Sequence, residues 1–148
     1  MRDDTKRKLF LDVNPEILKM LKSIKEKGYK LGLISNCSYE EVAGFRSCEI
    51  FDCFDAVLLS CEVKMVKPER RIYEACAERL GVNPNECLYI GDGGSDELAG
   101  AAQCGMHSIK AVWFLKEFRN NYDDDKTFPL IYEPAGVAGY LELLASNN

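Results

Sequence analysis

Apolar and polar positions along the chain form blocks whose spacing alternates between that of a helix and that of a strand. Residues 15–27 repeat apolar side chains at helical spacing, begin with a proline and stop before Gly28, which is typical of an amphipathic helix. Residues 29–36 form an apolar run too short for a helix, which favours a strand buried on both faces. The predicted inner face of the helix consists of Ile17, Leu18, Leu21 and Ile24.

The same alternation returns along the rest of the chain. Strands are predicted at residues 51–60, with Cys53 interposed, at 87–92 and at 108–114. Helices are predicted at residues 68–81, 95–105 and 136–144, the first with Ile72, Tyr73, Cys76 and Leu80 on its inner face. Strands that alternate with helices at this spacing indicate right-handed βαβ units. We therefore expect an α/β fold, a three-layer sandwich with a mostly parallel, Rossmann-like sheet.

Composition and charge limit the partners of this fold. A chain of 148 residues with 47% hydrophobic content fits one domain, residues 1–148. Its net charge of −5 and its pI near 5.0, without any long block of Lys or Arg, argue against nucleic acid or an acidic membrane surface as a partner. No run of about 18 apolar residues is present, so no membrane-spanning segment is predicted.

Cysteine usage indicates a reducing compartment. The seven cysteines are an odd number without a CxxC pair, and the N-terminus does not resemble a signal peptide, so we expect free thiols and a cytoplasmic location. Irregular cysteine spacing and the single histidine, His107, argue against zinc. Residues 123–125 lack the alternating oxygen ligands and the glycine of a calcium loop, so a solvated loop over residues 116–128 is the preferred interpretation.

Polar residues lie at the end of one predicted strand and just before one predicted helix. Ser35 and Asn36 end the strand at residues 29–36, and Lys67 precedes the helix at residues 68–81. Ligands of open parallel sheets bind at the carboxyl ends of the strands, so we expect these residues to lie close together. The Ser35 hydroxyl and the Asn36 amide are suited to donate to phosphate oxygens, and Lys67 is suited to offset their charge.

The segment GDGGSDE, residues 91–97, brings acids and glycines to the same edge. Asp92 is suited to hold Mg²⁺, which prefers hard oxygen ligands. Gly93 and Gly94 let the backbone approach a bound group, and the helix that starts near them points its positive end at the site. Asp96 and Glu97 have a simpler alternative role, the stabilisation of that helix N-terminus.

Each of these residues alone also has an ordinary structural interpretation. Ser35 is as well suited to cap a strand end, Lys67 to lie on the surface, and Gly93 and Gly94 to form a turn. Three separate segments nevertheless carry the right residue types at strand ends. Their combination favours one phosphate and metal site.

The motifs LISN at residues 33–36, VKPERRIYEACAERLGV at 66–82 and YIGDGGSDELAGAAQCGM at 89–106 resemble the second, third and fourth motifs of the haloacid dehalogenase superfamily. These are Mg²⁺-dependent hydrolases that work through an aspartyl-phosphate. The resemblance runs from about residue 15 to residue 112, most of the chain.

The resemblance implies a role for each matching residue. Ser35 matches the phosphate-binding hydroxyl, and Lys67 matches the lysine that steadies the nucleophile and the phosphoryl group. Asp92 matches the metal ligand, and Asp96 matches the second acid of the fourth motif, near the waters of the metal and Lys67. Such groups stabilise a phosphoryl transition state mainly by position and charge.

The chain departs from the family at the first motif. That motif is an apolar strand ending in DxDxT or DxDxS, whose leading Asp attacks phosphorus, and no such strand is found here. The nearest candidate is the D-x-N of Asp12 and Asn14. We favour the interpretation that residues 8–36 are the segment after a cap domain, with the nucleophile strand and the cap outside this chain. In the alternative, residues 7–13 are the first strand and bring Asp12 to the edge of the site.

A missing first-motif strand has consequences for stability as well. In the family fold that strand lies between those predicted here at residues 30–35 and 87–91, so its absence leaves two rows of unpaired backbone groups. Each unmade buried hydrogen bond costs about 1 to 3 kcal/mol. We therefore expect residues 7–13 to fill the position, or another chain to contribute a strand through a homodimer or strand exchange.

The leading functional hypothesis is a Mg²⁺-dependent phosphohydrolase-type domain, incomplete in this chain alone, that acts on a small phosphorylated metabolite. The alternative is a non-catalytic remnant that binds phosphate or Mg²⁺ as an interaction module. A hydrolase of carbon–halogen bonds is disfavoured, because those members of the family need no metal and residues 91–97 are rich in acids. A dinucleotide-binding domain is disfavoured, because GDGG follows a late strand and lacks the third glycine at the right spacing.

Overall fold

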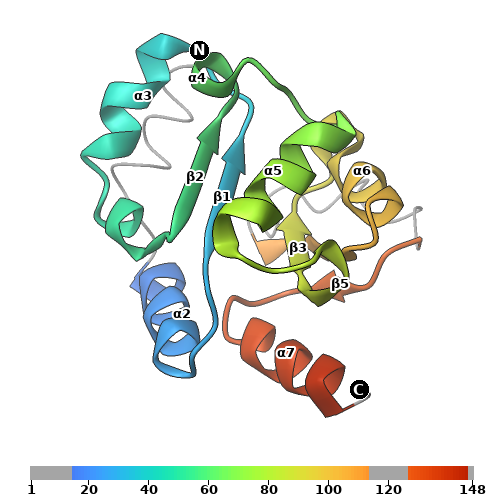
Figure 1. Ribbon diagram of the computed structural model, residues 1–148. Coiled ribbons are helices and arrows are strands. Elements are labelled where there is room, and N and C mark those ends of the chain that lie inside the picture. Colours follow the sequence, from blue (N-terminus) through green and yellow to red (C-terminus); the bar gives the residue numbers. More distant parts are fainter. Residues whose placement is uncertain (1–14, 114–126, 147–148) are drawn as a thin grey trace.

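Parallel strands flanked by helices make up the computed structural model of the chain, which describes residues 15–113 and 127–146 (Figure 1). None of the helices in these ranges is long and apolar enough to cross a membrane. In chain order the elements are α2 (Pro15–Glu26), β1 (Gly32–Ser35), α3 (Tyr39–Arg46), η1 (Glu49–Cys53), β2 (Ala56–Leu59), α4 (Ser60–Val63), α5 (Arg70–Leu80), η2 (Pro84–Glu86), β3 (Leu88–Gly91), η3 (Gly94–Asp96), α6 (Glu97–Gln103), β4 (His107–Ala111), β5 (Leu130–Ile131) and α7 (Gly136–Ser146).

The described strands form two separate parallel sheets. β1 pairs with β2 in a register that places Gly32 opposite Ala56 and Ser35 opposite Leu59. β3 pairs with β4, and β4 pairs in turn with β5. Because all the strands run parallel, their carboxyl ends within each sheet lie at one edge.

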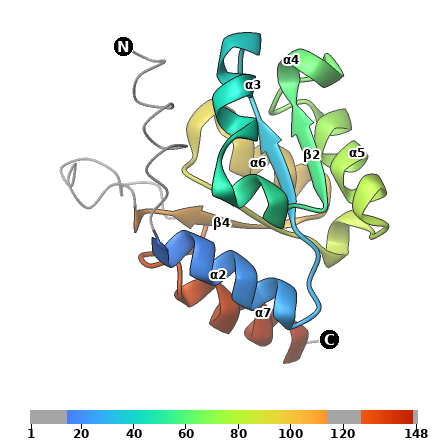
Figure 2. The ribbon, with the colours of Figure 1, turned by 90° about the vertical axis from the view of Figure 1, so that its left-hand side faces the viewer.

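Helices cover both faces of the strands, as Figures 1 and 2 show. α5 and α6 pack with β2 around one buried cluster, whereas α2 and α7 pack with β4 and β5 around a second. The first cluster has at its centre Leu58, Ile72, Tyr73, Ala77 and Ala101, and the second consists of Ile24, Ile109, Ile131 and Val137. The expected three-layer α/β fold is confirmed.

Most predicted elements are present with shorter bounds, and one strand was predicted too long. Residues 49–53 form the 3-10 turn η1 and not the start of a strand, which begins only at Ala56. In this turn Phe51 packs edge-on against Phe45 of α3, with ring centroids 5.7 Å apart, and Cys53 is buried. Apolar residues here are buried by a turn, which short-range periodicity does not distinguish from a strand. Most of the predicted loop at residues 116–128 lies outside the described residues.

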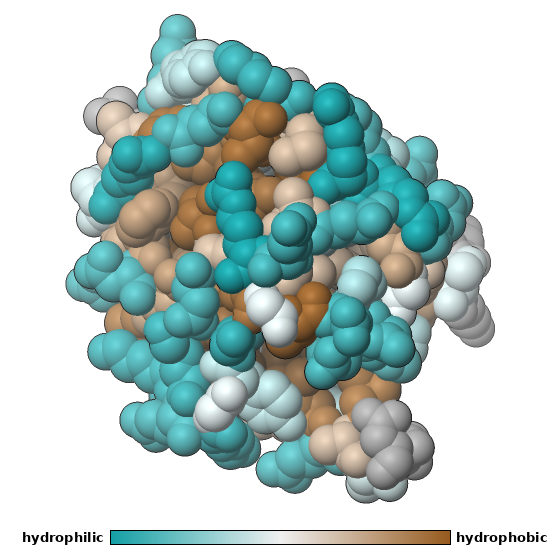
Figure 3. All heavy atoms as spheres, in the orientation of Figure 1, coloured by the Kyte–Doolittle hydropathy of each residue, from teal (hydrophilic) through white to brown (hydrophobic). Residues whose placement is uncertain are grey.

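Figure 3 shows that polar side chains cover most of one face of the molecule, while apolar atoms reach the surface in its upper part. Four large apolar side chains in the described ranges are exposed, and they lie in separate segments of the chain. They are Tyr39, Val66, Tyr132 and Leu143.

Within the described residues, β1 and β3 are not paired with each other, and each has a hydrogen-bonded neighbour on one side only. Neither strand contains a fully buried residue, although strands of a covered parallel sheet are normally buried. A cavity of about 460 Å³ opens near the amino ends of β3 and β4, where Tyr29, Leu88 and His107 contribute to its lining. The prediction that residues 7–13 or a strand of another chain pair with β1 and β3 lies outside the described residues.

We expect Leu11→Asp to lower the free energy of unfolding by about 1 to 3 kcal/mol, because a charge in a strand between β1 and β3 loses its hydration. Urea denaturation measures the change, and Thr5→Asp, which adds the same charge outside residues 7–13, is the control. A dimer in light scattering, with stability that falls on dilution, would assign the strand to another chain. Equal stability of both variants and the wild type in a monomer would contradict the prediction.

Candidate functional site

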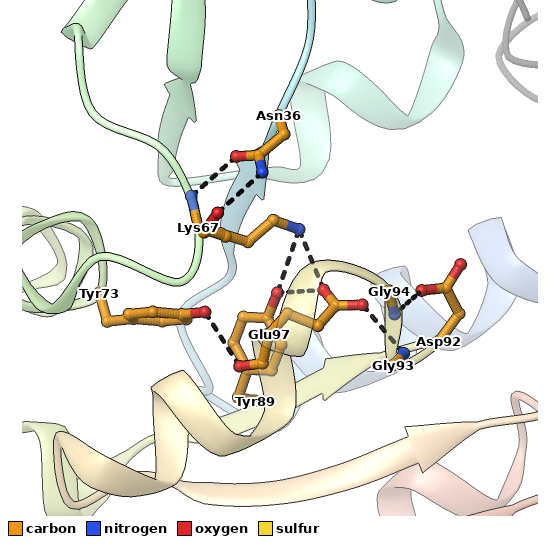
Figure 4. A network of polar contacts seen from close by, with 8 residues as sticks. All are labelled: Asn36, Lys67, Tyr73, Tyr89, Asp92, Gly93, Gly94 and Glu97. Atoms are coloured by element: carbon orange, nitrogen blue, oxygen red, sulfur yellow. Dashed lines mark hydrogen bonds and ion pairs between the residues drawn. The ribbon is translucent and has the colours of Figure 1, made fainter.

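The candidate site lies where the carboxyl ends of β1 and β3 face the loop between α4 and α5 (Figure 4). Asn36 follows β1, Lys67 stands in the loop, and Asp92 follows β3. Glu97 is the first residue of α6. Segments far apart in the sequence therefore contribute to one polar network.

Asn36 fixes the loop that carries Lys67. The backbone N–H of Lys67 donates to Asn36 Oδ1 at 2.9 Å, and Asn36 Nδ2 donates to the carbonyl oxygen of Lys67 at 3.1 Å. This two-point contact ties the loop to the end of β1. The side-chain amide of Asn36 thus positions Lys67, and the binding of phosphate by Asn36 stays a prediction.

Lys67 forms a nearly buried ion pair with Glu97. Its Nζ lies 3.0 Å from Glu97 Oε1, and the side chains of Lys67 and Glu97 are only 14% and 6% exposed. Nζ also donates to the Tyr89 hydroxyl at 3.2 Å, and that hydroxyl donates to Glu97 Oε1 at 2.5 Å. Burial and the neighbouring Glu97 raise the pKa of Tyr89, so the phenol keeps its proton and donates to the carboxylate.

The side chain of Glu97 also explains why glycines stand at positions 91 and 93. Glu97 Oε2 accepts a hydrogen bond of 3.0 Å from the backbone N–H of Gly93, whose φ of +98° favours glycine. A Cβ atom at Gly91 would lie 2.5 Å from Glu97 Cδ. Gly91 is therefore small because the side chain of Glu97 lies against the end of β3.

Asp92 lies beside this pair on the exposed side. Its carboxylate accepts a hydrogen bond of 2.9 Å from the backbone N–H of Gly94. Partial burial opposes ionisation of Asp92, but hydrogen bonds with Glu97 and Gly94 and the charge of Lys67 outweigh it, and its pKa lies below the usual range. Asp92 is consequently a carboxylate at neutral pH.

Asp96 occupies a different position from the one predicted for it. The sequence assigns the acid near Lys67 to Asp96, but the structure brings the next residue, Glu97, onto the ammonium group. Ser95 and Asp96 both have positive φ angles, 56° and 51°, and this turn leaves Asp96 exposed and Glu97 buried. The role of Asp96 as a metal ligand stays a prediction.

Ser35 ends β1, half-buried, directly before Asn36. Its hydroxyl hydrogen-bonds the thiol of Cys37. The structure thus places Ser35, Lys67 and Asp92 at strand and loop ends of one rim, as the sequence predicts, without testing their roles.

The donor set at the rim fits Mg²⁺, although the described residues contain no group of three or more His, Cys, Asp or Glu side chains close enough to hold a metal. Asp92 and Glu97 each lie near Lys67 and supply two carboxyl groups. Mg²⁺ is usually held by one or two carboxylates, with water and substrate phosphate completing its shell.

The letters of the first family motif do occur in this chain, at residues 123–127, where Asp-Asp-Asp-Lys-Thr reads DxDxT. They follow the polar segment at residues 116–122 and not an apolar strand. All of them except Thr127 lie outside the described residues, as does Asp12. Among the residues that the structure describes, no first-motif nucleophile is therefore placed at the rim.

Comparison with known proteins identifies the class. A family profile of haloacid dehalogenase-like hydrolases matches residues 3–105, which is more than half of the chain. The chain belongs to this family. The fold of a HAD phosphatase from Thermococcus onnurineus superposes with a TM-score of 0.76 at 24% identity, covering 95% of this chain and 64% of that one.

Two curated relatives show the range of activities among similar proteins. The chain is 28% identical over 138 residues to (S)-2-haloacid dehalogenase 4A of Burkholderia cepacia, covering 93% of this chain and 57% of the relative. It is 30% identical over 102 residues to glyceraldehyde 3-phosphate phosphatase of Methanopyrus kandleri, covering 68% of this chain and 44% of the relative. The chain thus spans about half the length of the curated relatives it matches.

We expect Glu97→Gln to destabilise the fold by about 3 to 5 kcal/mol, because it removes the negative charge in direct contact with the nearly buried Lys67 ammonium group. Asp96→Asn is the matched control, since asparagine tolerates the positive φ of this exposed residue, and it is expected to change stability by about 0.5 kcal/mol or less. Urea denaturation compares the two variants. An effect of Asp96→Asn as large as that of Glu97→Gln would contradict the observed pairing.

Proposed function

We propose that this chain forms the core of a Mg²⁺-dependent phosphohydrolase that acts on a small phosphorylated metabolite through an aspartyl-phosphate, and that it is incomplete on its own. The observation that carries the proposal is the Lys67 ammonium group, fixed by Asn36 and flanked by the carboxyl groups of Asp92 and Glu97. The phosphatases among the relatives support the proposal that the substrate carries a phosphate group.

The residues of the rim have distinct tasks in this proposal. The Ser35 hydroxyl and the Asn36 backbone bind phosphate oxygens, and Lys67 neutralises negative charge on the phosphoryl group. Asp92, held ionised, orients a bound Mg²⁺, and Asp96 or Glu97 orients its waters. The metal supplies positive charge to the phosphoryl oxygens when bound.

Glu97 extends this assignment. Its carboxylate shares the ammonium group of Lys67 with the Tyr89 hydroxyl, so the amine is held by two acceptors on the β3 and α6 side. This arrangement fixes the Lys67 ammonium group in place before substrate arrives, which is how preorganised groups stabilise charge that develops during reaction.

The alternative is a non-catalytic module that binds phosphate or Mg²⁺. It is favoured by the lack of a first-motif aspartate at the rim among the described residues. We propose a cytoplasmic location for either function, which accords with the free state of all seven cysteines.

Calorimetric titration with inorganic phosphate and Mg²⁺ is expected to show phosphate binding that strengthens with the metal. Lys67→Ala is expected to weaken phosphate binding at least about tenfold, and Asp92→Asn to remove the effect of the metal. Lys19→Ala, at an exposed position of α2, is the control. Phosphate heats unaffected by Lys67→Ala would refute the site for both candidate functions.

Turnover separates the enzyme from the binding module. The proposal expects hydrolysis of p-nitrophenyl phosphate with Mg²⁺ once an upstream strand with DxDxT is joined to this chain, and its loss on Asp92→Asn by about a hundredfold or more. Glu40→Gln on the exposed side of α3 is expected to retain full activity. Binding without turnover in that longer chain would support the module, and halide release from a 2-haloacid would support a dehalogenase instead.

A further inference from the structure

Two cysteines lie opposite each other at the ends of neighbouring parallel segments. The β1–β2 register places Ser35 opposite Leu59, and two residues further on it leads to Cys37 after β1 and Cys61 in α4. Figure 2 shows the ends of β1 and β2 running together toward α3 and α4. The cysteines thus each follow the last paired residues of the two strands by two positions.

Ser60 holds these two segments together directly beside the thiols. The backbone N–H of Cys37 donates to Ser60 Oγ at 2.9 Å, and the Ser60 hydroxyl donates to the carbonyl oxygen of Cys37 at 3.1 Å. Ser60 is itself buried. The backbones at Cys37 and Cys61 are therefore fixed at close approach.

The two thiols lie near enough to interact, because Cys61 raises the pKa of the Cys37 thiol. Both cysteines are half-buried, and both are free in this structure. Neighbouring strands lie about 4.8 Å apart, and a disulfide needs Cα atoms separated by about 4.4 to 6.8 Å. A bond between Cys37 and Cys61 thus requires little movement of the backbone.

We propose that Cys37 and Cys61 form a reversible disulfide bond on exposure to a small disulfide such as oxidised glutathione. One thiolate attacks a glutathione sulfur, which releases one glutathione and leaves a mixed disulfide on the protein. The second thiolate attacks the protein sulfur of that mixed disulfide and releases the second glutathione. Two protons leave the cysteines, and two electrons pass to the glutathione disulfide.

Charged groups around the pair set the pH dependence of the reaction. Burial raises the pKa of Cys37, and the neighbouring Cys61 and the carboxylate of Glu41 on α3 raise it further, against a hydrogen bond with Ser35 that lowers it. Lys64 lies near Cys61 and donates to the Tyr39 hydroxyl. Because Cys37 keeps its proton near neutral pH, the rate of bond formation rises as pH increases from about 7 to 9.

The bond would connect both sides of the rim that holds Lys67. Cys37 directly follows Asn36, which binds the Lys67 backbone, and Cys61 stands in the helix that leads into the Lys67 loop. A cross-link here restricts the segments that position Lys67. It forms whether or not the rim binds phosphate.

Peptide mapping of the intact chain tests the bond. After oxidation by glutathione disulfide at about pH 8.5 and alkylation of the remaining thiols, trypsin is expected to yield residues 31–46 joined to residues 47–64 through Cys37 and Cys61. Dithiothreitol should separate the two peptides. Cys37→Ser and Cys61→Ser should each abolish the link, whereas Cys87→Ser, which removes a half-buried thiol before β3, should retain it.

Thermal unfolding supplies a second readout. The oxidised wild type is expected to unfold at a higher midpoint than the reduced form, a shift that dithiothreitol reverses and that both serine variants lack. Cys37 and Cys61 recovered only as separate glutathione adducts or alkylated thiols at every pH would overturn the proposal, irrespective of how the variants fold.

Discussion

The site is organised around a nearly buried ion pair between Lys67 and Glu97. Each charge is costly to bury alone, because neither is hydrated by bulk water. Their pairing requires that the loop between α4 and α5 and the start of α6 meet within hydrogen-bond distance. Asn36 fixes that loop from the side of β1, so the pair connects one sheet with the other, although β1 and β3 are not paired.

Several small residues are required by this arrangement. Gly91 lacks a side chain because Glu97 occupies that space, and a Cβ atom at Gly100 would lie 2.8 Å from both Pro68 Cβ and the Tyr73 hydroxyl oxygen. Tyr73 in turn donates a hydrogen bond of 2.9 Å to the carbonyl oxygen of Glu97. The close approach of α5 and α6 and the position of the ion pair therefore depend on each other.

The same arrangement suits chemistry on an anion. A fixed ammonium group beside two carboxyl groups offers a phosphoryl group a positive partner and a divalent cation a place at the same rim. Members of the haloacid dehalogenase-like hydrolases include both phosphatases and dehalogenases, so family membership alone does not choose between them. The presence of two carboxyl groups, Asp92 and Glu97, beside Lys67 is the feature of this chain that supports the proposed metal and phosphate site.

Local periodicity was sufficient to predict the helices α2, α5 and α7, because one apolar face repeats at helical spacing over at least two turns. It also led to the prediction that Ser35, Lys67 and Asp92 lie at one edge, because the strand ends of a parallel sheet share an edge. It failed at residues 51–53, which form a 3-10 turn in which Cys53 is buried and Phe51 packs on Phe45 of α3.

The sequence by itself determined the fold class and the residue types at the rim, since these follow from the spacing of residues along the chain. It indicated the family through the resemblance of its motifs to those of known members. Only the tertiary structure decided that Glu97 and not Asp96 meets Lys67. The two acids are adjacent and chemically alike, and the path of the chain through two residues of positive φ selects which of them turns inward. The hydrogen bond between the Asn36 side chain and the Lys67 backbone likewise appears only in the tertiary structure, because the two residues are 31 positions apart in sequence.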